Sequence, residues 1–114
     1  MEIVIFFLKL SAAVPMLVFG IHQLQNPMAW SHNLPSFLRN ELGETDTKTF
    51  MEFHSVANIA LSVWLISGFT LKLSALVVLL WYLALTPFVW QQKWSNGVRD
   101  LSIAFAVFAL FLLA

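Results

Sequence analysis

Four long apolar segments occupy most of the 114-residue chain and leave little of it for anything else. The two clearest, Phe53–Leu71 and Leu73–Gln92, contain no Asp, Glu, Lys or Arg. Each has the length of about 20 residues with which a helix crosses the ~30 Å apolar core of a bilayer. The sequence therefore predicts an all-α fold, an integral membrane four-helix bundle that forms a single transmembrane domain over residues 1–114.

The polar breaks between the apolar segments predict where the helices begin and end. We expect helices at residues 3–24, 49–67, 72–92 and 98–114. Asn26-Pro27 ends the first helix, Gly68 marks a short turn, and Asn96-Gly97 marks another. Residues 26–48 are expected to form an interfacial loop. Because Met1-Glu2 supplies no basic region, we expect the first apolar run to be retained as a helix and not removed as a signal peptide.

Composition excludes several classes of function. Hydrophobic residues make up 60% of the chain and charged residues 11%, whereas soluble domains are about a quarter charged. The formal net charge is zero, so binding of nucleic acid has no electrostatic support. The chain has no cysteine, which excludes thiol–disulfide chemistry by this chain alone and Cys-ligated iron–sulfur or zinc sites.

Polar residues gather at one end of the expected bundle. Four spans place both termini on one side of the membrane, and the 26–48 loop and the turn near Asn96 on the other. Every helix carries polar or aromatic groups toward that loop side: His22, Gln23, Glu52, His54, Trp90, Gln91, Arg99 and Asp100. They predict a polar crown, over which the loop containing Trp30 and His32 could fold as a lid. Lys and Arg number four on the loop side and two on the other, a weak indication of cytoplasmic loops.

The second expected helix has the clearest internal polar face. His54 and Asn58 are four residues apart, and Ser55 and Ser62 continue the stripe at helical spacing. Asn58 falls near the bilayer centre, where exposure of its amide to lipid would be costly, so it should face the bundle interior. Hydrogen bonding that only holds the helices together explains such an Asn as well as contact with a ligand does.

These patterns yield a set of candidate ligand-binding residues: His22, Glu52, His54, Asn58, Trp30, Trp90 and Arg99. No tight metal-ligand spacing occurs among them, and no metal site is expected. Two histidines near an interface are a weak basis for haem. The cofactor stays open, with a quinone compatible with the pattern. Neither catalytic nor cofactor-binding residues can be assigned, and the sequence does not decide whether the chain is an enzyme.

Local motifs resemble a known family. Gly20 with Asn26-Pro27-Met28-Ala29-Trp30, the segment Asn58–Gly68 and the segment Asn96–Leu101 are similar to patterns in the DoxX-like membrane proteins. These are small four-helix proteins, mostly bacterial, and the resemblance covers nearly the whole chain. The family often carries a Glu where this chain has Asn58. A proton-linked role of that position therefore depends on Glu52 or His54 substituting for it.

The resemblance implies a membrane subunit associated with a quinone-linked or oxidative-stress oxidoreductase system in the bacterial cytoplasmic membrane. It also implies a distant likeness to the vitamin K epoxide reductase bundle, whose thiol chemistry a chain without cysteine cannot carry. The leading hypothesis is a protein that binds a hydrophobic small molecule. His54 and Asn58 would hydrogen-bond its head group, Glu52 or His22 would relay a proton, and Arg99 would stabilise negative charge.

Two alternatives remain open. The chain could be a non-enzymatic membrane assembly or lipid-handling scaffold, in which the polar face is purely structural. It could also be a small oligomeric transporter, because the small-residue face of Ser102, Ala106 and Ala109 permits close packing between subunits. The expected partners are the lipid bilayer, a protein of a redox complex and further copies of the chain.

Overall fold

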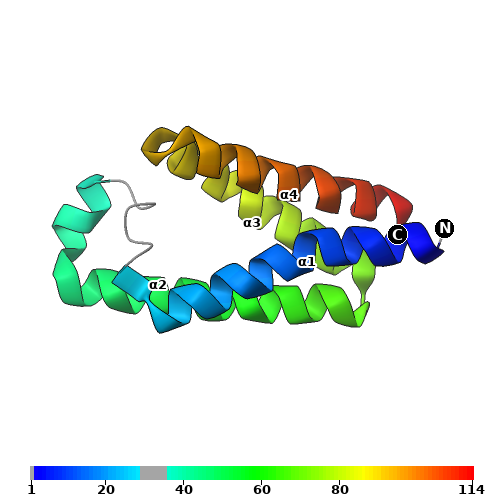
Figure 1. The fold of residues 1–114 in the computed structure, drawn as a ribbon, viewed down its shortest axis with the longest axis horizontal. Coiled ribbons are helices and arrows are strands. Elements are labelled where there is room, and N and C mark those ends of the chain that lie inside the picture. The colour runs from blue at the N-terminus through cyan, green and yellow to red at the C-terminus, as the bar shows by residue number, and fades with distance from the viewer. Residues whose placement is uncertain (1, 29–35) are drawn as a thin grey trace.

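The computed structural model describes residues 2–28 and 36–114, and within these ranges the chain is almost entirely helical and has no strand. The helices are α1 (Glu2–Gln25), α2 (Ser36–Ser67), α3 (Leu71–Gln92) and α4 (Trp94–Leu113). They run up and down, so that both termini lie at one end of the molecule (Figure 1). At the other end lie the α3–α4 turn, the end of α1 and the beginning of α2. The predicted all-α four-helix bundle is confirmed.

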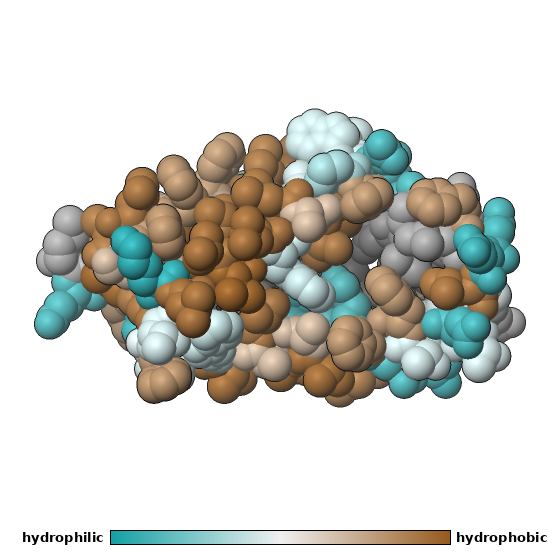
Figure 2. Space-filling view, turned by 180° about the vertical axis from the view of Figure 1, so that it is seen from behind, coloured by the Kyte–Doolittle hydropathy of each residue, from teal (hydrophilic) through white to brown (hydrophobic). Residues whose placement is uncertain are grey.

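The outer surface of the bundle is apolar. Four stretches are long and apolar enough to cross a membrane: Glu2–Gln25, Thr45–Ser67, Leu71–Gln92 and Trp94–Leu113. Phe53, Phe105 and Leu112 are among the large apolar side chains that are largely exposed along them. Brown apolar residues dominate the middle of the face in Figure 2, and teal polar residues gather toward its two ends. Lipid is the solvent that such a surface fits, and the chain is a multi-pass membrane protein.

The interior changes character along the bundle axis. α1 packs mainly along α2, and α3 packs mainly along α4. The half nearer the termini has an apolar core that includes Ala12, Met16, Leu65, Val78 and Leu110. Toward the opposite end the buried side chains include polar ones: Gln23, Thr47, Ser55, Asn58 and Asp100. The buried amide and carboxyl groups therefore lie away from the termini, whereas the buried Ser74 hydroxyl lies nearer to them.

The expected interfacial loop 26–48 is wrong over its second half, because α2 already begins at Ser36. The lack of a long apolar run in this segment favours a loop, but a helix that does not span the lipid needs no such run. The helix is broken at Gly43, whose φ of 74° and ψ of 179° are essentially confined to glycine. In Figure 1 the first turns of α2 consequently rise away from the axis of the bundle.

α4 begins earlier than expected, at Trp94 instead of Val98, so Asn96-Gly97 is not the turn. The turn is confined to Lys93, which is extended at φ −156° and ψ 111°. Gly97 lies in the first turns of the helix. A larger residue would not fit there, because a Cβ would come within 2.6 Å of the Trp90 ring. An Asn-Gly pair usually signals a turn, but here the glycine serves close packing of α3 on α4. The bounds of α1 and α3 match the expected ones to within one residue.

Candidate ligand-binding site

Four side chains from three helices form a hydrogen-bonded cluster in the interior. Gln23 comes from α1, His54 and Asn58 from α2, and Trp81 from α3. Asn58 Nδ2 donates to Gln23 Oε1 at 3.2 Å, and Trp81 Nε1 donates to Asn58 Oδ1 at 3.2 Å. His54 Nδ1 lies 3.2 Å from Gln23 Oε1 and 3.3 Å from Asn58 Nδ2. We call these four residues the polar cluster.

Burial and depth explain why the polar cluster is bonded internally. Asn58 is 3% exposed and Gln23 is 4% exposed. Asn58 also lies near the middle of the 23-residue apolar stretch Thr45–Ser67. A buried amide without partners would be costly there. The His54 and Trp81 rings stack with their centres 5.2 Å apart and their planes 29° apart, which further closes the cluster.

Asn58 uses both its amide oxygen and its amide nitrogen within the polar cluster. Its oxygen accepts from Trp81, and its nitrogen faces Gln23 Oε1 and His54 Nδ1. An Asn side chain has one oxygen and one NH₂ group to satisfy. Asn58 therefore ties α1, α2 and α3 together.

Gln23 and His54 do have unused capacity. Gln23 Nε2 makes no hydrogen bond with any residue that the structure describes, although it carries two N–H donors. His54 uses Nδ1 within the cluster, and among the described residues its Nε2 is likewise without a partner. If Nδ1 carries the proton and donates to Gln23, Nε2 is an acceptor; in the other tautomer Nε2 is a donor. The polar cluster thus offers a ligand one amide donor and one ring nitrogen of either kind.

The structure brings together only some of the predicted site residues. His54 and Asn58 lie in the polar cluster. His22 is exposed, because it lies about 100° around α1 from Gln23. Glu52 is half-buried, and among the described interactions its carboxylate takes no part in the cluster. Trp90 is packed against Gly97 where α3 meets α4.

Trp30, with His32 of the expected lid, lies outside the described residues. The proposed lid over the crown is therefore untested.

Arg99 belongs to a different flank of the bundle. Its Nε donates to Asp100 Oδ1 at 3.0 Å, and its Cζ lies 4.5 Å from the centre of the Phe19 ring. This geometry combines an ion pair within α4 with a cation–π contact to α1. The polar cluster, in contrast, joins α1 to α2 and α3.

Sequence reasoning left two members of the polar cluster out of the candidate set. Gln23 was placed in the crown but not among the ligand-binding candidates, and Trp81 was not singled out. Trp81 nevertheless carries a signal, since it lies in the middle of Leu71–Gln92 and not at an end, where interfacial tryptophans gather. A tryptophan N–H at that depth requires an acceptor from a neighbouring helix.

The fold and the cluster define a class: a small multi-pass helical membrane protein with a polar site inside its bundle. Within the described ranges, no group of three or more His, Asp or Glu side chains is arranged to hold a metal ion. No protein-family model, no curated protein and no solved structure matches the chain. The resemblance to DoxX-like proteins thus remains a prediction.

Proposed function

We propose that the chain is a DoxX-like membrane protein that binds a hydrophobic small molecule with a carbonyl head group, such as a quinone. It would act as a membrane subunit of an oxidoreductase system in the bacterial cytoplasmic membrane. The supporting observation is the unused donor capacity of Gln23 Nε2, in a side chain that is only 4% exposed. Buried donors normally have partners, and a bound acceptor would supply one.

The chemistry of the cluster favours a neutral acceptor in the ligand. Gln23 Nε2 can only donate, and a quinone carbonyl oxygen can only accept. His54 Nε2 can donate or accept, so it can remain bonded to a head group whose own protonation changes. In such a system the cofactor carries the electrons, while the protein binds and orients it. The residues of this chain need no nucleophile or metal for that task.

The proposal assigns roles that differ from those expected from the sequence. Asn58 now serves to hold Gln23 Oε1 and Trp81 Nε1 in place, instead of contacting the ligand itself. Gln23 replaces it as the donor to the head group. The hydrogen bonds of the polar cluster join only its own four residues, so proton relay by Glu52 or His22 and charge stabilisation by Arg99 are not part of the proposal.

Binding of a short quinone to the purified protein in nanodiscs tests the proposal. Quenching of tryptophan fluorescence gives the dissociation constant for the wild type, Gln23→Met and His54→Phe. Gln25→Met is the matched control, because Gln25 is exposed on the same helix. Loss of one ligand hydrogen bond is expected to weaken binding about tenfold in Gln23→Met, since ~1.4 kcal/mol is tenfold in affinity, and to leave the control unchanged. Equal binding by wild type and Gln23→Met would contradict the proposal.

A structural role is the second candidate, and the hydrogen bonds of Asn58 to two other helices favour it. In a scaffold, the polar cluster would serve only to hold three helices in register. The same Gln23→Met protein would then unfold at a lower temperature than the wild type, and neither protein would bind the quinone.

A further inference from the structure

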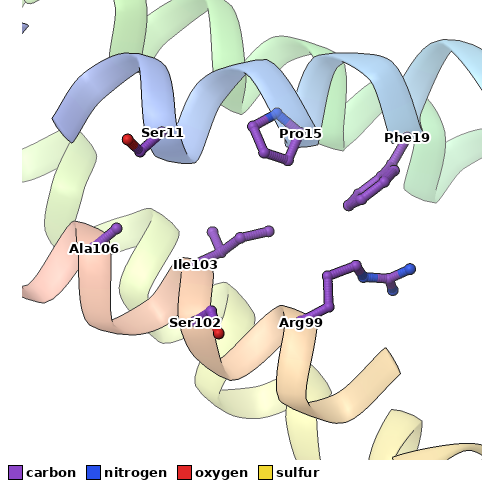
Figure 3. Close-up of a pocket in the computed structure, with 7 residues that line it drawn as sticks. All are labelled: Ser11, Pro15, Phe19, Arg99, Ser102, Ile103 and Ala106. Carbon is purple, nitrogen blue, oxygen red and sulfur yellow. The ribbon is translucent and has the colours of Figure 1, made fainter. Parts of the chain in front are cut away.

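A groove runs between α1 and α4. Its volume is about 490 Å³, within the roughly 300–1,000 Å³ of small-molecule pockets. Figure 3 shows side chains of both helices along it. It is lined by Ser11, Pro15 and Phe19 from α1 and by Arg99, Ser102, Ile103 and Ala106 from α4.

The groove is apolar along most of its length. The two serine hydroxyls that line it are turned back onto their own helices. Ser11 Oγ donates to Phe7 O at 2.8 Å, and Ser102 Oγ donates to Val98 O at 2.9 Å. Ser102 and Ala106, which the sequence suggested as a contact between subunits, are too small to fill the space opposite α1. The groove thus suits a hydrocarbon chain better than a polar ligand.

Phe19 and Arg99 form one end of the groove (Figure 3). The guanidinium of Arg99 lies over the Phe19 ring and is paired with the Asp100 carboxylate at 3.0 Å. Since an Arg–Asp pair has no net charge, an anionic head group would have to compete with Asp100 for the guanidinium. The charges at this end therefore favour a neutral occupant over an anionic phospholipid.

The groove and the polar cluster both include a residue of α1, and these two residues are one helical turn apart. Phe19 and Gln23 are four residues apart, which is about 6 Å along the helix axis. Gln23 brings to that position the amide donor that lacks a partner among the described residues. A molecule with its head at Gln23 could reach the groove with the first few carbons of a tail.

We propose that the α1–α4 groove holds the hydrocarbon tail of a neutral ligand whose carbonyl head group binds at Gln23 and His54. This inference rests on the proposed function and adds the class of ligand: a neutral amphiphile with a long tail. Within lipid, the tail gains by packing and not by leaving water, so its contribution to affinity is moderate.

Two ligands with the same ring test this inference, a benzoquinone with a decyl tail and one with a methyl group in its place. Binding to each is measured in nanodiscs of neutral phospholipid for the wild type, Ala106→Phe and Ala84→Phe. Ala106→Phe fills the groove, and Ala84→Phe is the control on the exposed side of α3. Ala106→Phe is expected to weaken binding of the decyl compound by roughly three- to tenfold, through lost packing, and to leave the methyl compound unchanged. The control is expected to change neither.

The outcomes separate this inference from the proposed function. If the methyl compound binds and Ala106→Phe affects both compounds equally or neither, the tail site is overturned and the head-group site stands. If neither compound binds the wild type, the proposed function fails and the inference fails with it. Displacement of the decyl compound by added anionic phospholipid would also overturn the inference, because it would make a charged lipid the occupant. Ser102→Leu narrows the groove from the next turn and gives an independent variant should Ala106→Phe fail to fold.

Discussion

Asn58 carries a primary amide into the middle of a membrane span, and its surroundings show what makes this tolerable. Trp81 satisfies its oxygen, and Gln23 and His54 lie within hydrogen-bonding distance of its nitrogen. Two of these contacts join α2 to α1 and α3, and the third joins Asn58 to His54 one turn earlier in α2. Removing the amide would therefore leave Trp81 Nε1 without its acceptor and would take one donor from Gln23 Oε1.

We expect Asn58→Leu to lower the free energy of unfolding by roughly 1–2 kcal/mol, as for other interhelical hydrogen bonds in membranes. Trp81 Nε1 loses its acceptor and Gln23 Oε1 loses a donor. Unfolding in mild detergent, followed by circular dichroism, measures the change. Val56→Leu on the exposed side of the same helix is the control and should be neutral. An Asn58→Leu protein as stable as the control would show that the cluster contributes nothing to stability.

The part of the polar cluster that could be predicted is the part on one helix. The spacing of His54 and Asn58 places them on one face whatever surrounds that helix. Gln23 and Trp81 are 35 and 23 residues away from Asn58. Which residues of α1 and α3 meet that face depends on how each helix is rotated about its axis, and hydropathy constrains this rotation only weakly.

At the scale of the helices, α1 packs closely against α2 at a glycine. A Cβ at Gly20 would come within 2.7 Å of Ile59 Cγ1 and 3.1 Å of the Ser55 carbonyl oxygen. Small residues permit such approaches between membrane helices. Gln23 lies almost one turn further along α1, so this approach brings its amide within reach of α2.

Substitution of Gly20 should lower stability, although helix propensity alone would predict an increase. Alanine in place of a helical glycine normally adds about 0.5–1 kcal/mol of stability. At Gly20, however, we expect Ala to destabilise and Leu to destabilise more, by roughly 1–3 kcal/mol through overpacking. Thermal unfolding in detergent measures both, with Val18→Ala on the exposed side of α1 as control. A Gly20→Ala protein that is more stable than the wild type would contradict the close contact.

The helices differ in how far their sequences predict them. The bounds of α1 and α3 follow from hydropathy and agree with the structure. The beginnings of α2 and α4 do not, because one lies in a polar segment and the other contains an Asn-Gly pair that packing holds in the helix.

At the scale of the whole molecule, the up-and-down course of four spans separates two ends. Both termini lie at one end, and the bend of α2 and the α3–α4 turn lie at the other (Figure 1). The polar cluster and the Arg99–Asp100 pair belong to the half away from the termini. A ligand site in this molecule would therefore lie nearer one membrane surface than the other.

This topology predicts the labelling pattern of single cysteines, which the cysteine-free chain makes simple to interpret. We introduce Glu2→Cys and Ala114→Cys at the termini, and Asn40→Cys and Ser95→Cys at the other end. A maleimide that cannot cross membranes should label both members of one pair in intact cells and neither member of the other pair. The pair that is labelled identifies which end of the bundle lies outside the cytoplasm. Equal labelling of all four positions would contradict a transmembrane course.

Hydropathy alone was sufficient for the number of spans, the helical class of the fold and the polar character of one end. The physical reason is that lipid acts on each helix separately, since a span must be long, apolar and bonded within itself whatever its neighbours are. Contacts between helices cannot be predicted from each helix separately in this way. The Gln23–Asn58–Trp81 bonds, the groove opposite Ser102 and Ala106, and the pairing of Arg99 with Phe19 depend on which faces meet and how closely. Tertiary packing decided these features, and the proposed binding site consists of them.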